Sequence, residues 1–138
     1  MRYGPWILNT FHKDDPLFQG FANISVPVAI SGVGYGSATP FPTVDIDNRL
    51  ASRKLTEHML GRGYRRIAYI IGPSYLPTLT PTPACPQLTT VRQPCYELGR
   101  TAGELLLTQI QGGPRGRAVY LPHTLIERDS TARCAVGS

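Results

Sequence analysis

Residues 43–73, TVDIDNRLASRKLTEHMLGRGYRRIAYIIGP, constrain the fold of this chain more than any other stretch. The stretch begins with a short β-prone run in which Val44 and Ile46 alternate with polar residues. Apolar side chains then recur every four positions, as on one face of a helix, and an apolar run at residues 67–71 closes at a Gly-Pro pair. Strand, helix and strand in this order predict two parallel strands joined by a right-handed crossover. We therefore expect an α/β fold with an open, mainly parallel sheet and helices on both faces.

The rest of the chain offers further short apolar runs and one more amphipathic helix. Gly61 and Gly63 are expected to end the first helix. A second helix is expected to begin at Pro94 and to stop at residues 112–114, Gly-Gly-Pro. A short, poorly formed helix is expected at residues 13–21. Strands are expected at residues 5–10, 26–30, 88–92, 119–121 and 124–126. The predicted sheet contains the strands near Ile7, Val28, Val44, Ile70 and Thr90.

Composition favours a small globular protein. The 138 residues suit one domain, and a formal charge of +5 with a pI of about 9.4 permits contact with nucleic acid through phosphate neutralisation. No basic run alternates with aromatic residues, so solvated surface charge is the preferred interpretation. Three cysteines without CxxC spacing favour reduced thiols over a disulfide framework or a metal site. The sequence thus predicts a cytoplasmic protein without a cofactor or metal, and without a membrane partner.

Two ordered blocks of sequence carry a resemblance to a known family. The first combines the Val-x-x-Asp-Asn pattern at residues 44–48 with GYRRIA at residues 63–68 and the Gly-Pro pair that follows. The second combines PQLTTVRQP at residues 86–94 with LIERDST at residues 125–131. In this order the blocks resemble the effector-binding domain of the lactose-repressor (LacI/GalR) family of bacterial transcriptional regulators.

The resemblance implies a domain organisation and a set of departures from the family. Residues 1–73 correspond to the first part of the N-terminal lobe, and residues 88–131 to the C-terminal part of the domain. Residues 74–87, which are proline-rich, take the place of most of the second lobe, and residues 132–138 form a loose tail. The family's helix-turn-helix pattern is not found, so DNA contact is expected only through a module absent here.

Ligands of open α/β sheets bind beyond the carboxyl ends of the strands, where Asp47 is predicted to lie. The resemblance implies that Asp47 faces the effector, whereas the residue pattern alone equally allows a helix-capping role. Ser31 and Gly32 end the preceding strand. Some family members carry an effector-contacting aspartate where this chain has Gly32, which puts a sugar-hydroxyl contact there in doubt.

Three further residues complete the expected effector site. The resemblance places Cys95 and Leu98 where apolar residues often line the cleft, although core packing is the simpler interpretation of Leu98. Arg92 follows a strand end and is either a polar ligand contact or a solvent-facing residue. His58 is interpreted as a structural helix residue, and the sequence favours no catalytic residues and no enzyme activity.

Competing functions remain open at this stage. The first is a partial effector-binding domain whose parent regulator senses a sugar or a nucleobase-like metabolite. The alternatives are a stand-alone module that dimerises with a full-length paralogue, and an inactive fragment. An uncovered strand near Trp6 and Ile7 predicts self-association as a homodimer, or association with a paralogue.

Overall fold

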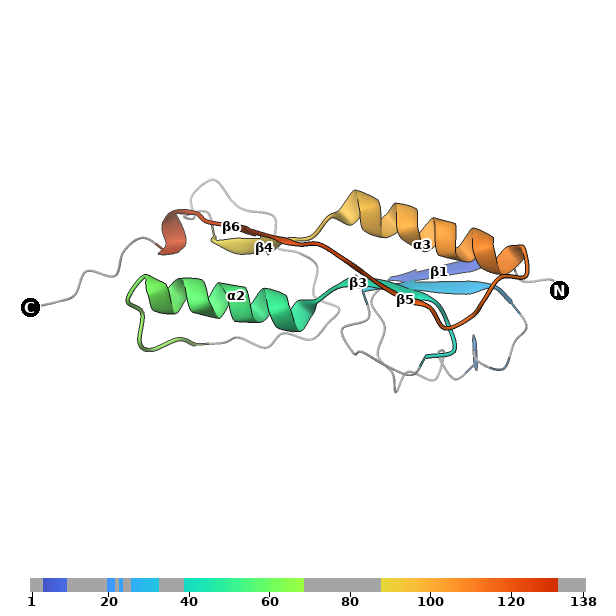
Figure 1. Ribbon diagram of the computed structural model, residues 1–138, viewed down its shortest axis with the longest axis horizontal. Helices are drawn as coiled ribbons and strands as arrows, with labels where there is room; N and C mark the ends of the chain where they lie inside the picture. The colour runs from blue at the N-terminus through green and yellow to red at the C-terminus, as the bar shows by residue number, and fades with distance from the viewer. Residues whose placement is uncertain are drawn as a thin grey trace, which may run out of the picture. The chain divides into compact units, whose positions relative to one another are not determined.

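The computed structural model describes residues 4–9, 20–21, 23, 26–32, 39–68 and 88–131. The chain divides into two compact units: Met1–Asp47 with Pro94–Pro122, and Asn48–Gln93 with His123–Ser138. Figure 1 shows their elements: β1 (Trp6–Asn9), β2 (Val28–Ser31), β3 (Thr43–Ile46), α2 (Asn48–Gly61), β4 (Thr90–Arg92), α3 (Cys95–Ile110), β5 (Ala118–Leu121), β6 (Thr124–Ile126) and a 3-10 turn (Asp129–Thr131).

The first unit contains a four-stranded parallel sheet in the order β1-β2-β3-β5. Each strand has only four residues, and β3 pairs with β5 along its full length, from Thr43 opposite Ala118 to Ile46 opposite Leu121. The amphipathic helix α3 packs against β1, β2 and β3. An α/β fold with a mainly parallel sheet is thereby confirmed.

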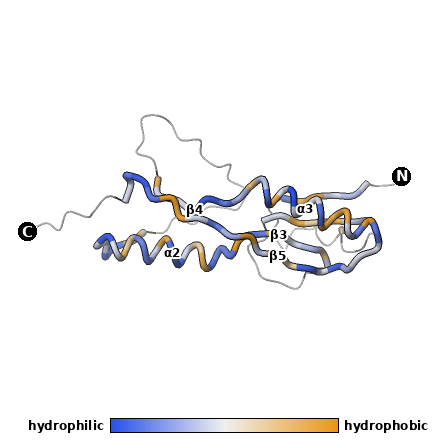
Figure 2. Tube along the Cα trace, turned by 45° about the horizontal axis from the view of Figure 1, so that its top comes forward, coloured by the Kyte–Doolittle hydropathy of each residue, from blue (hydrophilic) through white to orange (hydrophobic). Residues whose placement is uncertain are grey.

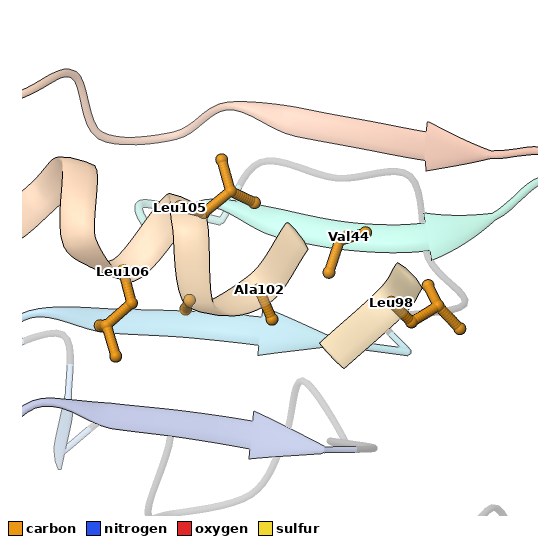
Figure 3. Packing of buried hydrophobic residues seen from close by; sticks show 6 residues of the cluster. Val44, Leu98, Ala102, Leu105 and Leu106 are labelled. Atoms are coloured by element: carbon orange, nitrogen blue, oxygen red, sulfur yellow. The ribbon is translucent and has the colours of Figure 1, made fainter. Parts of the chain in front are cut away.

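The main core of this unit lies between α3 and the sheet, where Figure 3 shows the side chains meeting. Ala102, at the centre of the helix face, is fully buried, and this small residue lets the helix approach the sheet closely. Burial of each large aliphatic side chain contributes about 1.5–3 kcal/mol. The cluster consists of Ala29, Val44, Leu98, Ala102, Leu105 and Leu106, with Val119 and Leu121 packed beside it.

Alternate strand residues face the opposite side of the sheet. There Val28 and Ile30 pack with Phe41, and the partly buried Leu8 and Phe21 border this second cluster. Phe21 is helical, so the described residues place helical structure on this face as well. Burial on both faces explains why β2 is apolar at three successive positions, as is typical of parallel strands.

The second unit pairs α2 with a small antiparallel sheet. Strands β4 and β6 pair from Thr90 opposite Ile126 to Arg92 opposite Thr124, and α2 contacts both strands. Helix α2 ends as its glycines predict. Gly63 adopts a φ of 96°, its N–H donates to the carbonyl of Leu60 (3.0 Å), and the N–H of Tyr64 donates to the carbonyl of Met59 (3.2 Å). This is the Schellman arrangement, which satisfies the free carbonyl groups at a helix end.

Two sequence-based expectations for the sheet are wrong. Strand β4, near Thr90, pairs antiparallel with β6 outside the parallel sheet, whereas β5 occupies the place beside β3. Ile67 and Ala68, at the start of the strand expected at residues 67–71, are not in a strand. Local periodicity identifies elements but carries no information on which strands pair.

Several expectations fall on residues outside the described ranges: most of the helix at residues 13–21, the strand near Ile70, the proline-rich stretch 74–87 and the tail 132–138. The division at residues 1–73, 74–87, 88–131 and 132–138 therefore stays a prediction. What the structure adds is that the chain passes between its two units after Asp47, after Gln93 and after Pro122.

Candidate functional site

The carboxyl edge of the parallel sheet gathers most of the predicted ligand-binding residues. Ser31 is the last residue of β2, and Gly32 follows it with a φ of 80°. The N–H of Gly32 donates to the carbonyl of Val44 (3.0 Å), which ties the end of β2 to β3. Asp47 directly follows β3 at the same edge. Parallel strands thus bring residues that are 16 positions apart to one edge of the sheet.

The first turn of α3 lies at this edge too, because the helix runs antiparallel to the strands. The side-chain amide of Gln109, near the helix end, donates to the carbonyl of Val28 at the start of β2. Figure 3 shows Leu98 toward the carboxyl ends of the strands. The eleven helical steps from Leu98 to Gln109 span about 16 Å, whereas a four-residue strand spans about 13 Å. The start of α3, with Cys95 as its first residue, therefore reaches beyond the strand ends.

Exposure separates the predicted residues into those that a ligand can reach and those that form the core. Asp47 and Cys95 are exposed, and Gly32 is half-buried. Ser31 is 9% exposed and Leu98 is 6% exposed, and Leu98 packs in the main core of the first unit. We call Ser31, Gly32, Asp47 and Cys95 the carboxyl-edge site. The core packing of Leu98 agrees with the simpler of the two interpretations given for it.

The chemistry of the carboxyl-edge site suits a polar, uncharged ligand. The Asp47 carboxylate accepts hydrogen bonds from hydroxyl groups. The partial positive charge at the start of α3 favours oxygen atoms. Because the negative carboxylate and the positive helix end lie at one edge, neither a cation nor an anion is favoured by both.

Arg92 is the one predicted site residue that lies in the other unit. It is the last residue of β4 and is exposed. Its assignment to the effector site stays a prediction, as do the assignments of the other five residues.

Sequence reasoning missed Asp45, which is only 4% exposed although it carries a carboxyl group. Its Oδ1 accepts a hydrogen bond from the N–H of Ile46 (2.7 Å). Asp45 lies opposite Tyr120 of β5 and, by alternation, on the face that α3 does not cover. The available signal was an aspartate inside a strand expected to be covered on both faces.

The second unit holds a separate polar cluster around His58. Its Nε2 lies 2.9 Å from Thr131 Oγ1, and its Nδ1 lies 3.5 Å from Glu127 Oε1. Glu127 also pairs with Arg62. Glu, His and hydroxyl in series resemble a nucleophilic triad, but Thr131 is 9% exposed and its hydroxyl is shared with Thr89 Oγ1 at 2.7 Å. The cluster therefore ties α2 to the 3-10 turn, in agreement with a structural role for His58.

The described residues contain neither a metal-ligand cluster nor a membrane-spanning helix. Within these ranges, histidine, cysteine, aspartate and glutamate do not gather in a group of three that could hold a metal ion. Among the helices described, none is both long and apolar enough to cross a membrane.

Comparison with known proteins gives two partial matches. Residues 76–131 match the model of the periplasmic binding protein-like domain. The chain is 38% identical over 68 residues to the HTH-type transcriptional regulator CelR of Thermobifida fusca. The aligned region covers 49% of this chain and 20% of that regulator. No solved structure matches the chain at a significant level.

Both matches support a LacI-like effector-binding domain in this part of the chain. The matched residues 76–131 include β4, α3, β5, β6 and the 3-10 turn, and so reach into both compact units. The aligned region spans about a fifth of the length of the CelR regulator.

Proposed function

We propose that this chain is a ligand-sensing part of a LacI-type transcriptional regulator, and that the carboxyl-edge site contacts a sugar or a related small metabolite. The observation that carries the proposal is the arrangement of Asp47 and the start of α3 at one edge of the parallel sheet, in a chain with a LacI-like effector-binding domain. A carboxylate and helix-end N–H groups together match the alternating donors and acceptors of sugar hydroxyls.

The proposal extends to the regulator as a whole. Its role is binding rather than catalysis, it acts in the cytoplasm where its operator DNA lies, and a helix-turn-helix module recognises the operator. The relative's printed name, an HTH-type transcriptional regulator, supports this assignment. Association with a second copy or with a paralogue is the alternative role, and the exposed residues of β1 favour it.

The test is an NMR titration of the isotope-labelled chain with a panel of pentoses, hexoses and nucleobases. We expect dissociation constants no tighter than about a millimolar, or about −4 kcal/mol, because a ligand at an open edge stays largely solvated. Shifts should concentrate at the amides of Ser31, Gly32, Asp47 and Cys95. Asp47→Asn should remove them, because the amide replaces an acceptor oxygen with a donor.

Asp129→Asn is the matched control. Asp129 is exposed and lies in the 3-10 turn of the second unit, so the same chemical change there should leave the titration unaltered. Shifts that map to other residues, or that survive Asp47→Asn, would refute the assignment of the carboxyl-edge site.

A further inference from the structure

Positive charge is concentrated on α2 and the turn that follows it. Residues 48–68 hold six of the fourteen basic residues of the chain and one acidic residue, Glu57. In the first unit, by contrast, the described arginines 100, 115 and 117 are offset by Asp45, Asp47, Glu97 and Glu104. In Figure 2, α2 is coloured mainly as hydrophilic.

These cations form one exposed set. Ala51 is buried, and Leu55, His58 and Met59 are half-buried, so the covered side of α2 is set by these residues. At 100° per residue, Arg49 and Arg53 lie on the opposite side, and Lys54 lies at its border. Arg65 and Arg66 follow the Schellman turn. We call Arg49, Arg53, Lys54, Arg65 and Arg66 the basic surface; all five are exposed.

The basic surface is not neutralised within the described part of the chain. Arg62 pairs with Glu127, but among the described residues none of the five members of the basic surface forms an ion pair. A surface of this kind attracts anions from outside the molecule.

Two placements on α2 are unfavourable for the helix itself. Arg49 lies in the first turn, which lacks acidic residues and where a cation opposes the macrodipole. Arg53 lies four residues later, so the two like charges repel each other. A nearby anion relieves both effects, whereas water does so less well. This distinguishes the basic surface from charges placed only for solubility.

The dimensions fit a polymer with closely spaced negative charges. From Arg49 to Gly61 the helix rises about 18 Å. Duplex DNA carries one phosphate charge per about 1.7 Å of its axis, so a surface of this length faces several phosphates at once. Arg65 and Arg66 add two cations beyond the helix end.

We propose that the basic surface binds the phosphate backbone of duplex DNA without reading its sequence. The guanidinium groups of Arg49, Arg53, Arg65 and Arg66 donate hydrogen bonds to phosphate oxygens, and Lys54 adds a mobile charge. Phosphate contacts position a protein on DNA but do not select a base sequence. The contact is independent of the carboxyl-edge site and of any helix-turn-helix module, so it stands or falls separately from the proposed function.

Fluorescence anisotropy with a labelled duplex of about 20 base pairs tests the proposal directly. With four phosphates contacted, raising NaCl from about 50 to about 200 mM should weaken binding roughly 100-fold. Duplexes of unrelated sequence should bind within about twofold of one another. The variant Arg49→Gln/Arg53→Gln/Arg65→Gln should flatten the slope of log K against log salt by about two to three. It should also bind at least about tenfold more weakly at the lower salt concentration.

The matched control is Arg100→Gln/Arg115→Gln/Arg117→Gln in the first unit, which lowers the net charge by the same amount. Its salt slope should equal that of the unaltered chain, and circular dichroism should show both variants folded. An equal loss in the control would mean that net charge alone drives binding, and would overturn the proposal. So would binding to vesicles rich in phosphatidylserine but not to duplex, or full competition by an equal concentration of tripolyphosphate.

Discussion

At the scale of the single residue, Arg49 is the position where stability and the proposed DNA contact oppose each other. It lies in the first turn of α2, is exposed, and stands four residues before Arg53. Arg49→Glu places a negative charge at the positive helix end and creates an i,i+4 pair with Arg53. We expect the free energy of unfolding to rise by about 1 kcal/mol and duplex binding to weaken.

Urea denaturation followed by circular dichroism measures this change. Arg100→Glu is the control, because Arg100 already pairs with Glu104 four residues later at 3.3 Å. There the same substitution replaces an attractive pair by a repulsive one, so the free energy of unfolding should fall slightly. If Arg49→Glu changed the free energy of unfolding as Arg100→Glu does, the position of Arg49 in the first turn would have no influence on the stability of α2.

At the scale of the element, the glycines of α3 differ in their roles. Gly103 lies inside the helix, and an added Cβ there would meet no atom within 4 Å. Gly113 follows the helix, and a Cβ there would lie 2.5 Å from Thr108 Cγ2 and 2.8 Å from the Thr108 carbonyl oxygen. We expect Gly103→Ala to stabilise the chain by about 0.5–1 kcal/mol through helix propensity.

Gly113→Ala should instead destabilise it by about 1–3 kcal/mol, since backbone must shift at the end of α3. Thermal unfolding of the two variants under identical conditions gives the comparison. If both alanines stabilise α3, then the hydrogen bond from the Gly113 N–H to the Thr108 carbonyl (2.8 Å) does not fix the helix end.

The same elements show how far the sequence predicts this molecule. Helix α3 and the end of α2 follow from local signals, because apolar periodicity and left-handed glycines act within a few residues. The place of β5 beside β3 joins residues about 75 positions apart, and such pairing depends on tertiary packing that no local pattern encodes. The predicted position of Asp47 depended only on a strand end, whereas the burial of Asp45 depends on what covers the sheet.

At the scale of the whole molecule, β1 is the element that bears on self-association. Among the described strands it pairs only with β2, and residues 4–9 carry no charge that would repel a second copy. Trp6 and Ile7 are 42% and 43% exposed, and Trp6 already packs against Phe21 with ring centroids 5.8 Å apart. Covering the remaining surface contributes roughly 1–3 kcal/mol, less than the 3–6 kcal/mol expected for fully exposed side chains.

We therefore expect a weak dimer. The free energy gained by covering Trp6 and Ile7 is smaller than the roughly 4 kcal/mol that corresponds to a millimolar dissociation constant. Main-chain pairing adds only about 0.5–1.5 kcal/mol per hydrogen bond. Sedimentation velocity over a range of protein concentrations should show reversible association that Trp6→Lys abolishes, since the ammonium group would be desolvated between two strands. Tyr120→Lys is the control, because Tyr120 is 57% exposed on β5 at the other end of the described sheet. Loss of association in the Tyr120 variant alone would move the interface to β5. A monomer at every concentration would refute self-association through β1.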